Sequence, residues 1–271
     1  MSDIAHSEEY GNLISSIQVL ENELAGLVLE RDELIYHVCP KIQTEYMLKI
    51  GKLEYAVYEI QIKILRTKRK IEIIQSFLNR EQKYNLADIE KQLDIEHKEY
   101  TQKLLDKQKE IDAARLKKSS AGKLLSDVES SELKKLYTQI VKKLHPDINP
   151  NTTEQEHSQF NDAVEAYKNA NLSELRIIYL LLEKTIPSST DTKNTMEKLI
   201  TKKEILINEK SYLKNEIEKI INTFPYNKKE LLLDENKMKE KIDELSDLLS
   251  EHNGHYSEIE NYLKEIEKTN E

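Results

Sequence analysis

The sequence has few of the residues that build thick globular cores or crosslink small ones. Its 271 residues include no tryptophan, three phenylalanines and one cysteine, Cys39, which excludes an intramolecular disulfide and a cysteine-based zinc site. Glycine and proline number five each, so few positions break helices. Charged residues make up 34% of the chain, as is typical of long helices with narrow apolar seams. We therefore predict an all-α, elongated protein.

Long apolar runs and strongly basic stretches are missing as well. No apolar run approaches the roughly 18 residues that cross a bilayer. The polar N-terminal sequence MSDIAHSEEYGN lacks the basic start and the apolar stretch of a signal peptide. The net charge is −9, and no section is basic enough for a dedicated nucleic-acid surface. We therefore expect a cytoplasmic protein that binds neither membranes nor nucleic acids.

Recognisable catalytic and metal-binding patterns are also absent from the sequence. No phosphate-binding loop, nucleophile elbow or pair of catalytic carboxylates is visible. His252 and His255 are spaced as metal ligands can be, but they lack nearby carboxylates on the same helix face. We expect no catalytic residue, no metal and no cofactor, and hence no enzyme.

Two polar breaks divide the chain into three segments. Residues 119–122 separate a long-helix, coiled-coil region at 1–118 from a compact unit at 119–186, and the run that begins at Pro187 opens a third segment at 187–271. In the first segment we expect one helix to end before Cys39 and another to begin near Pro40, because proline interrupts helices. The third segment is typical of a helical hairpin with a short turn.

The two outer segments carry apolar stripes at helical spacing, as in Leu13, Ile17, Leu20, Leu24 and Leu27. A lone helix cannot bury such a stripe, so each must pack on antiparallel neighbours or on a second copy of the chain. The stripes fit two roles equally well. The helices are either arms that bring the protein to a client or scaffold protein, or a brace or homodimer interface.

The central segment carries the most informative chemistry, between Ser130 and Tyr179. Ser130 or Ser131 can cap a helix that has one apolar and one basic face. The apolar face consists of Leu133, Leu136, Tyr137, Ile140, Val141 and Leu144. The basic residues, largely off that face, are Lys134, Lys135, Lys142 and Lys143.

Pro146 ends this helix and opens a tight loop. The residue before a proline is pushed out of the α region, so His145 is expected at the helix end and Asp147 in an exposed loop. Thr152-x-x-Gln155 and Thr153-x-x-Glu156 are alternative capping boxes for a second helix, which is acidic. The unit is therefore predicted to be an antiparallel pair of a basic and an acidic helix. The apolar face of the second helix consists of Phe160, Ala163, Val164 and Tyr167.

This stretch resembles helices II and III of a J-domain, the DnaJ-type co-chaperone module. The family pattern is a basic helix with a central tyrosine, then Lys-x-His-Pro-Asp-x-Asn-Pro, then an acidic helix with phenylalanine and Glu-Ala-Tyr. The match covers about 40 residues, and so many coincident positions make it more specific than a short motif alone. The matching positions are Tyr137, Lys143, His145, Pro146, Asp147, Asn149, Pro150, Phe160, Glu165, Ala166 and Tyr167.

The resemblance implies a co-chaperone without catalytic groups of its own, whose partner is a DnaK-type chaperone ATPase. The basic helix would dock on an acidic surface of that ATPase. Asp147 would then compete for an arginine contact that restrains ATP hydrolysis, while Pro146 keeps the loop rigid and His145 fixes it and contacts the partner. The implied partner-binding residues are His145, Pro146, Asp147, Lys134, Lys135, Lys142, Lys143, Tyr137 and Asn149.

The chain also departs from the family pattern. The Tyr-x-x-Leu-Gly signature of the first J-domain helix is missing, so the end of the long helix or the segment at 122–128 would have to replace it. Leu144 stands where tyrosine is usual, and an apolar helix at 172–184 replaces a basic one. These departures support an alternative function, a structural coiled-coil scaffold whose hairpin is inactive or binds another protein.

Overall fold

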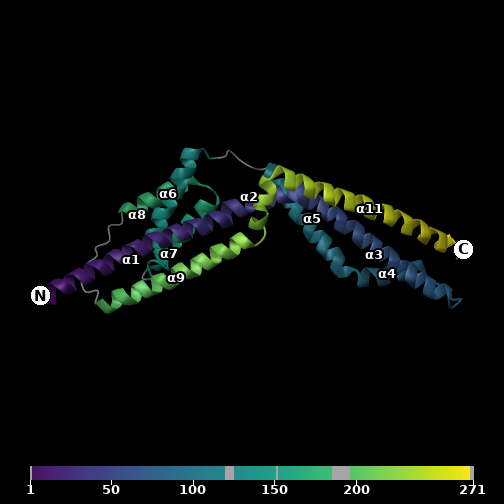
Figure 1. Cartoon of the computed structure of the whole chain (residues 1–271), viewed down its shortest axis with the longest axis horizontal. Helices are drawn as coiled ribbons and strands as arrows, with labels where there is room; N and C mark the ends of the chain where they lie inside the picture. The colour runs from purple at the N-terminus through teal and green to yellow at the C-terminus, as the bar shows by residue number, and fades with distance from the viewer. Residues whose placement is uncertain (1, 120–124, 151, 185–195, 269–271) are drawn as a thin grey trace. The chain divides into compact units, whose positions relative to one another are not determined.

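The computed structural model describes residues 2–119, 125–150, 152–184 and 196–268, and every regular element in these ranges is helical. The prediction of an all-α protein is therefore confirmed (Figure 1). None of the helices in these ranges is long and apolar enough to cross a membrane.

The N-terminal helix continues through Pro40, so the break predicted there is wrong. The backbone N–H of Cys39 donates to the carbonyl of Leu34, five residues back, in a π-helical turn. This wider turn gives the proline ring room beside carbonyls that an α-helix would bring into a clash. The successive segments are α1 (Ser2–Glu33), η1 (Leu34–Val38), α2 (Cys39–Tyr46), η2 (Met47–Gly51) and α3 (Lys52–Leu78).

The chain divides into two compact units, each built from two separate parts of the sequence. The first comprises Met1–Pro40 and Gly122–Asn227, and the second comprises Lys41–Ala121 and Lys228–Glu271. This grouping differs from the three consecutive segments expected from the sequence. The central hairpin shares a unit with the first helix of the chain.

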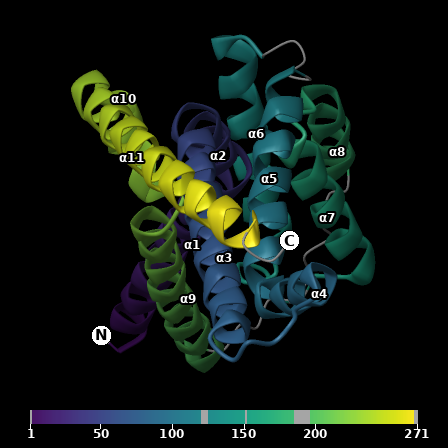
Figure 2. The same cartoon turned by 90° about the vertical axis from the view of Figure 1, so that its right-hand side faces the viewer.

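In the first unit α1 pairs with α9 (Met196–Asn222), and the two helices lie side by side in both views (Figures 1 and 2). Ion pairs join Glu21 to Lys202 at 2.7 Å and Arg31 to Glu216 at 3.8 Å, so the two helices run parallel. Three shorter helices complete the unit. They are α6 (Asp127–Leu144), α7 (Glu154–Lys168) and α8 (Leu172–Lys184).

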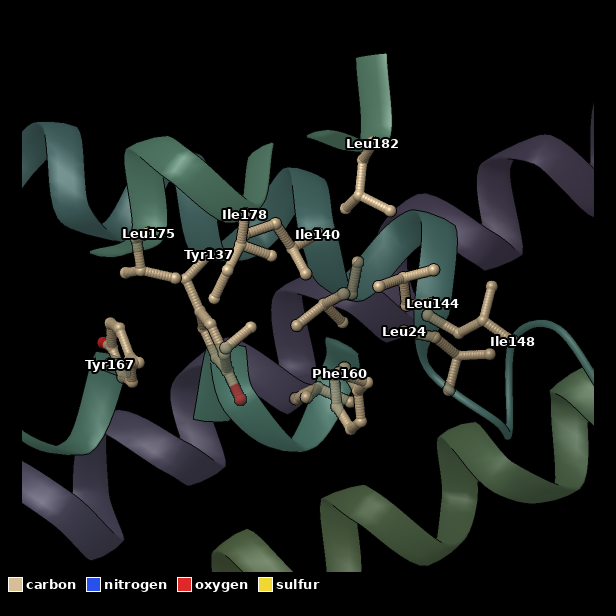
Figure 3. Close-up of a cluster of buried hydrophobic side chains, with 14 of the residues drawn as sticks. Leu24, Tyr137, Ile140, Leu144, Ile148, Phe160, Tyr167, Leu175, Ile178 and Leu182 are labelled. Atoms are coloured by element: carbon tan, nitrogen blue, oxygen red, sulfur yellow. The ribbon is translucent and has the colours of Figure 1, made fainter. Parts of the chain in front are cut away.

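The core of the first unit lies where α1, α6, α7 and α8 meet (Figure 3). Apolar residues spaced three or four apart on each helix face inwards together. The helix pair α6–α7 supplies most of the aromatic residues, and α1 supplies aliphatic ones. The largest fully buried side chains in this core are Leu24, Tyr137, Ile140, Leu144, Ile148, Tyr167 and Leu175, together with Leu206 and Leu213 of α9.

The second unit is built on a parallel pair of α3 and α11 (Glu235–Lys268). Gln61 lies 3.0 Å from the ring of His252, and the Gln75 amide donates to the Tyr262 hydroxyl at 2.9 Å. Polar contacts between paired helices favour one register of the two. The remaining helices of this unit are α4 (Leu86–Glu96), α5 (Lys98–Ser119) and α10 (Lys229–Leu233), and the short η3 (Tyr226–Lys228) precedes α10.

The two long helices described in the third segment, within residues 196–268, each pack along a helix from the N-terminal part of the chain. Helix α9 packs along α1, and helix α11 packs along α3. Long-range parallel pairing therefore replaces the antiparallel neighbours expected from the short turn.

Candidate functional site

The basic helix of the central hairpin begins earlier than expected. The N-cap of α6 is Ser126, not Ser130 or Ser131: its hydroxyl accepts from the N–H of Glu129, and the Glu129 carboxylate accepts from the N–H of Ser126. This reciprocal capping box satisfies two backbone donors at once, which neither later serine can do. Of the two boxes expected for the next helix, Thr153 with Glu156 is the one that forms at the start of α7.

The loop between the two helices is a compact turn held by backbone hydrogen bonds. His145 ends α6 with extended backbone angles, as the following proline requires. Its carbonyl accepts from the N–H of Ile148 at 3.1 Å and from that of Asn149 at 2.8 Å. The Asn149 side chain donates to the carbonyl of Lys142 at 2.8 Å, which ties the loop back to α6. These hydrogen bonds hold the turn against the end of α6.

His145 is a buried, neutral support for the aspartate of the loop. Its side chain is 6% exposed and meets the Phe160 ring edge-to-face, with centroids 5.1 Å apart. The backbone N–H of Asp147 donates to its Nδ1 at 3.2 Å, so that nitrogen carries no proton. Burial lowers the pKa of His145, although the nearby carboxylate of Asp147 opposes this shift. The Asp147 side chain remains 41% exposed.

The four lysines of α6 remain exposed, but they are not equivalent. Lys134 forms an ion pair with Glu33 of α1 at 2.8 Å. The ammonium group of Lys143 lies over the Tyr179 ring of α8, 5.5 Å from its centroid. Lys135 and Lys142, seven residues apart, share the outward face and form no ion pair with any described residue. The expected basic face is therefore open to solvent.

Tyr137 is fully buried, and of the residues that the resemblance assigns to partner binding only His145 is also buried. Its ring stacks on Tyr167 with centroids 4.1 Å apart, and its hydroxyl donates to the buried carboxylate of Asp32 at 2.6 Å. Tyr167 donates in turn to Glu33, the next residue of α1. Burial and these carboxylates raise the pKa of both tyrosines. Tyr137 thus joins the hairpin to α1 instead of facing a partner.

Asp32 and Glu33 are the functional residues that sequence reasoning missed. We name them, with Tyr137 and Tyr167, the tyrosine–carboxylate clamp. Asp32 is only 2% exposed, and Arg31 lies 2.8 Å from its carboxylate. The sequence contained one sign of this cluster. Asp32 lies eight positions after Leu24, on the same face of α1, where the apolar stripe predicts an apolar residue. Through this clamp α1 is tied to both α6 and α7.

A groove separates the loop from α9. Its volume is about 460 Å³, and its walls include Asp147, Ile148 and Pro150 on one side and Thr201 and Leu206 on the other. Glu209 of α9 is close enough that burial and the charge of Asp147 raise its pKa. The loop therefore faces α9 across this groove, and Asp147 is one of the residues that line it.

Comparison with known proteins gives no match: no family model, no curated protein and no solved structure matches this chain. Among the described residues, no cluster of three side chains could hold a metal ion. What the site can do must therefore be argued from its residues and their geometry.

Replacing Tyr137 with phenylalanine removes the hydroxyl that satisfies the buried Asp32 carboxylate. A hydrogen bond to a charged group stabilises a fold by about 1.5–3 kcal/mol, so we expect a loss of that size in the free energy of unfolding. Tyr212→Phe is the matched control, because its hydroxyl also donates to a carboxylate, Glu216, but on the surface. Urea unfolding measures the free energy of unfolding of both variants. Equal small losses in the two would contradict a stabilising role of the clamp.

The lowered pKa of His145 predicts a pH dependence of stability. The unfolded state binds a proton near pH 6.5 while the folded state resists it, so the free energy of unfolding falls as the pH drops below 6.5. Urea midpoints measured between pH 7 and about pH 5, above the main titration of carboxylates, should fall less in His145→Gln than in the wild type. His157→Gln, at an exposed histidine, should keep the wild-type slope. The same dependence of urea midpoint on pH in all three proteins would contradict a lowered pKa of His145.

Proposed function

We propose that the chain is a co-chaperone that docks on a DnaK-type chaperone and stimulates its ATP hydrolysis. One observation carries the proposal: a rigid turn presents Asp147, half-exposed, beside a row of exposed lysines at the end of α6. A buried neutral histidine orients the aspartate, and an asparagine ties the turn to the helix. Residues with these roles are what the J-domain resemblance calls for.

The proposed mechanism divides the work between the lysines and the loop. Lys135, Lys142 and Lys143 attract the acidic surface of the ATPase, which raises the rate of encounter and sets the orientation. Asp147 then competes for the arginine contact that restrains hydrolysis in the partner. The contact of Asp147 with this arginine is more favourable in the hydrolysing conformation of the partner than in its resting conformation. Binding therefore shifts the partner towards the hydrolysing conformation. The chain itself performs no chemistry and needs no cofactor.

The remainder of the chain would determine to which client or scaffold protein the loop is brought. The α3–α11 pair and its neighbours have no part in the hairpin core, so they are free to hold a client, a scaffold protein or a second copy of the chain. A cytoplasmic setting agrees with the single cysteine, because a disulfide within the chain is impossible.

A second function is favoured by the state of Tyr137 and Lys134. Both are engaged by α1, Tyr137 through Asp32 and Lys134 through Glu33, and the buried Tyr137 does not face a partner as the resemblance implies. The chain would then be a helical scaffold that keeps the hairpin for structural reasons or for binding another protein. The two functions differ in whether Asp147 acts on an ATPase.

The test is the single-turnover ATPase rate of a DnaK-type chaperone from the same cell, with and without the full chain. The proposal predicts stimulation that Asp147→Asn and His145→Gln abolish, because one removes the competing charge and the other its support. Asp162→Asn is the control, since it removes one exposed acidic charge from α7, away from the loop. No stimulation by saturating wild-type protein would leave the scaffold function standing.

A further inference from the structure

The outer face of α8 carries exposed aliphatic side chains. Its inner face is buried in the hairpin core through Leu172, Leu175 and Ile178. On the opposite side Ile177 is 59% exposed and Leu180 is 54% exposed, and the adjacent Leu181 is 50% exposed. These three lie at positions i, i+3 and i+4, so they form one continuous strip along the helix. A contiguous apolar strip on a charged protein marks an interaction surface.

The side of α8 next to this strip contacts α6. Arg176 forms a bidentate pair with Glu132 of α6, at 2.7 and 2.6 Å, and Tyr179 lies under the ammonium group of Lys143. These contacts hold the two helices together and place their outer faces next to each other. The apolar strip of α8 therefore borders the lysine row of α6.

The charges on this combined surface are mixed, because the exposed Glu174 lies one turn before Ile177 on α8. Glu132 is already paired with Arg176, whereas Lys135 and Lys142 form no ion pair with any residue in the described ranges. A partner that covers both helices must therefore bring carboxylates to the lysines and apolar side chains to Ile177 and Leu180. Burying those side chains supplies binding energy that the screened surface charges cannot supply alone.

We infer that the strip formed by Ile177, Leu180 and Leu181 is an apolar anchor for the chaperone ATPase that docks on α6. This inference rests on the proposed function and extends its docking surface from α6 onto α8. The partner surface it requires carries apolar side chains flanked by carboxylates. The lysines set the association rate and the orientation of the ATPase. The strip lowers its dissociation rate, and Asp147 stimulates hydrolysis in the bound complex.

The experiment measures ATPase stimulation by the full chain over a range of concentrations. The double variant Ile177→Ser/Leu180→Ser should raise the concentration for half-maximal stimulation about tenfold, the effect of losing about 1.4 kcal/mol of binding energy. Its maximal stimulation should stay at the wild-type level, because the loop is untouched. The control is Val19→Ser/Ile207→Ser, at two exposed aliphatic positions of α1 and α9, which should leave both quantities unchanged.

Ionic strength separates the strip from the lysines. The α8 variant should keep the wild-type dependence of half-maximal concentration on salt, whereas Lys135→Gln/Lys142→Gln should flatten it. If the wild-type chain stimulates and the α8 variant behaves like the control, the inference alone is overturned. If the wild-type chain does not stimulate, the proposed function is overturned and the inference with it. A wild-type dimer that the α8 variant dissociates, measured by sedimentation, would show that a second copy occupies the strip instead.

Discussion

The hydrogen bond from Tyr137 to Asp32 is the contact on which the first unit depends. A carboxylate that is 2% exposed is costly unless donors surround it, and here Arg31 and the tyrosine hydroxyl provide them. Removing either donor would leave a buried charge poorly satisfied. Because the donor lies on α6 and the acceptor on α1, the contact joins two elements that are 105 residues apart in sequence. The hairpin and the first helix of the chain therefore form one folded body.

The residues of this contact also influence His145 in the loop. The charges of Arg31 and Asp32 both act on His145, the arginine lowering its pKa and the aspartate raising it, behind the larger effects of burial and of Asp147. The residues that fasten α1 to α6 are thus electrostatic neighbours of the histidine that supports Asp147.

Local features of the site could be predicted from the sequence, whereas its long-range partners could not. The loop at His145 and Pro146 was predictable because a proline constrains the residue before it, and the Thr153 capping box because its residues are three apart. The burial of Tyr137 by Asp32 was not, because an apolar stripe reveals which face of a helix is covered but not by which helix or in which direction. The same ambiguity hid the parallel pairing of α1 with α9 and α3 with α11. Pro40 failed as a boundary because a π-helical turn accommodates it.

Amide hydrogen exchange tests most directly whether α1 completes the hairpin. The variant Asp32→Ala/Glu33→Ala keeps strong helix formers in α1 while removing both carboxylates of the clamp. The account predicts that amides of α6 and α7 exchange faster together in this variant, while those of α3 and α11 in the other unit keep their wild-type rates. Unchanged protection of α6 and α7 would show that the hairpin folds without the clamp and would contradict the account.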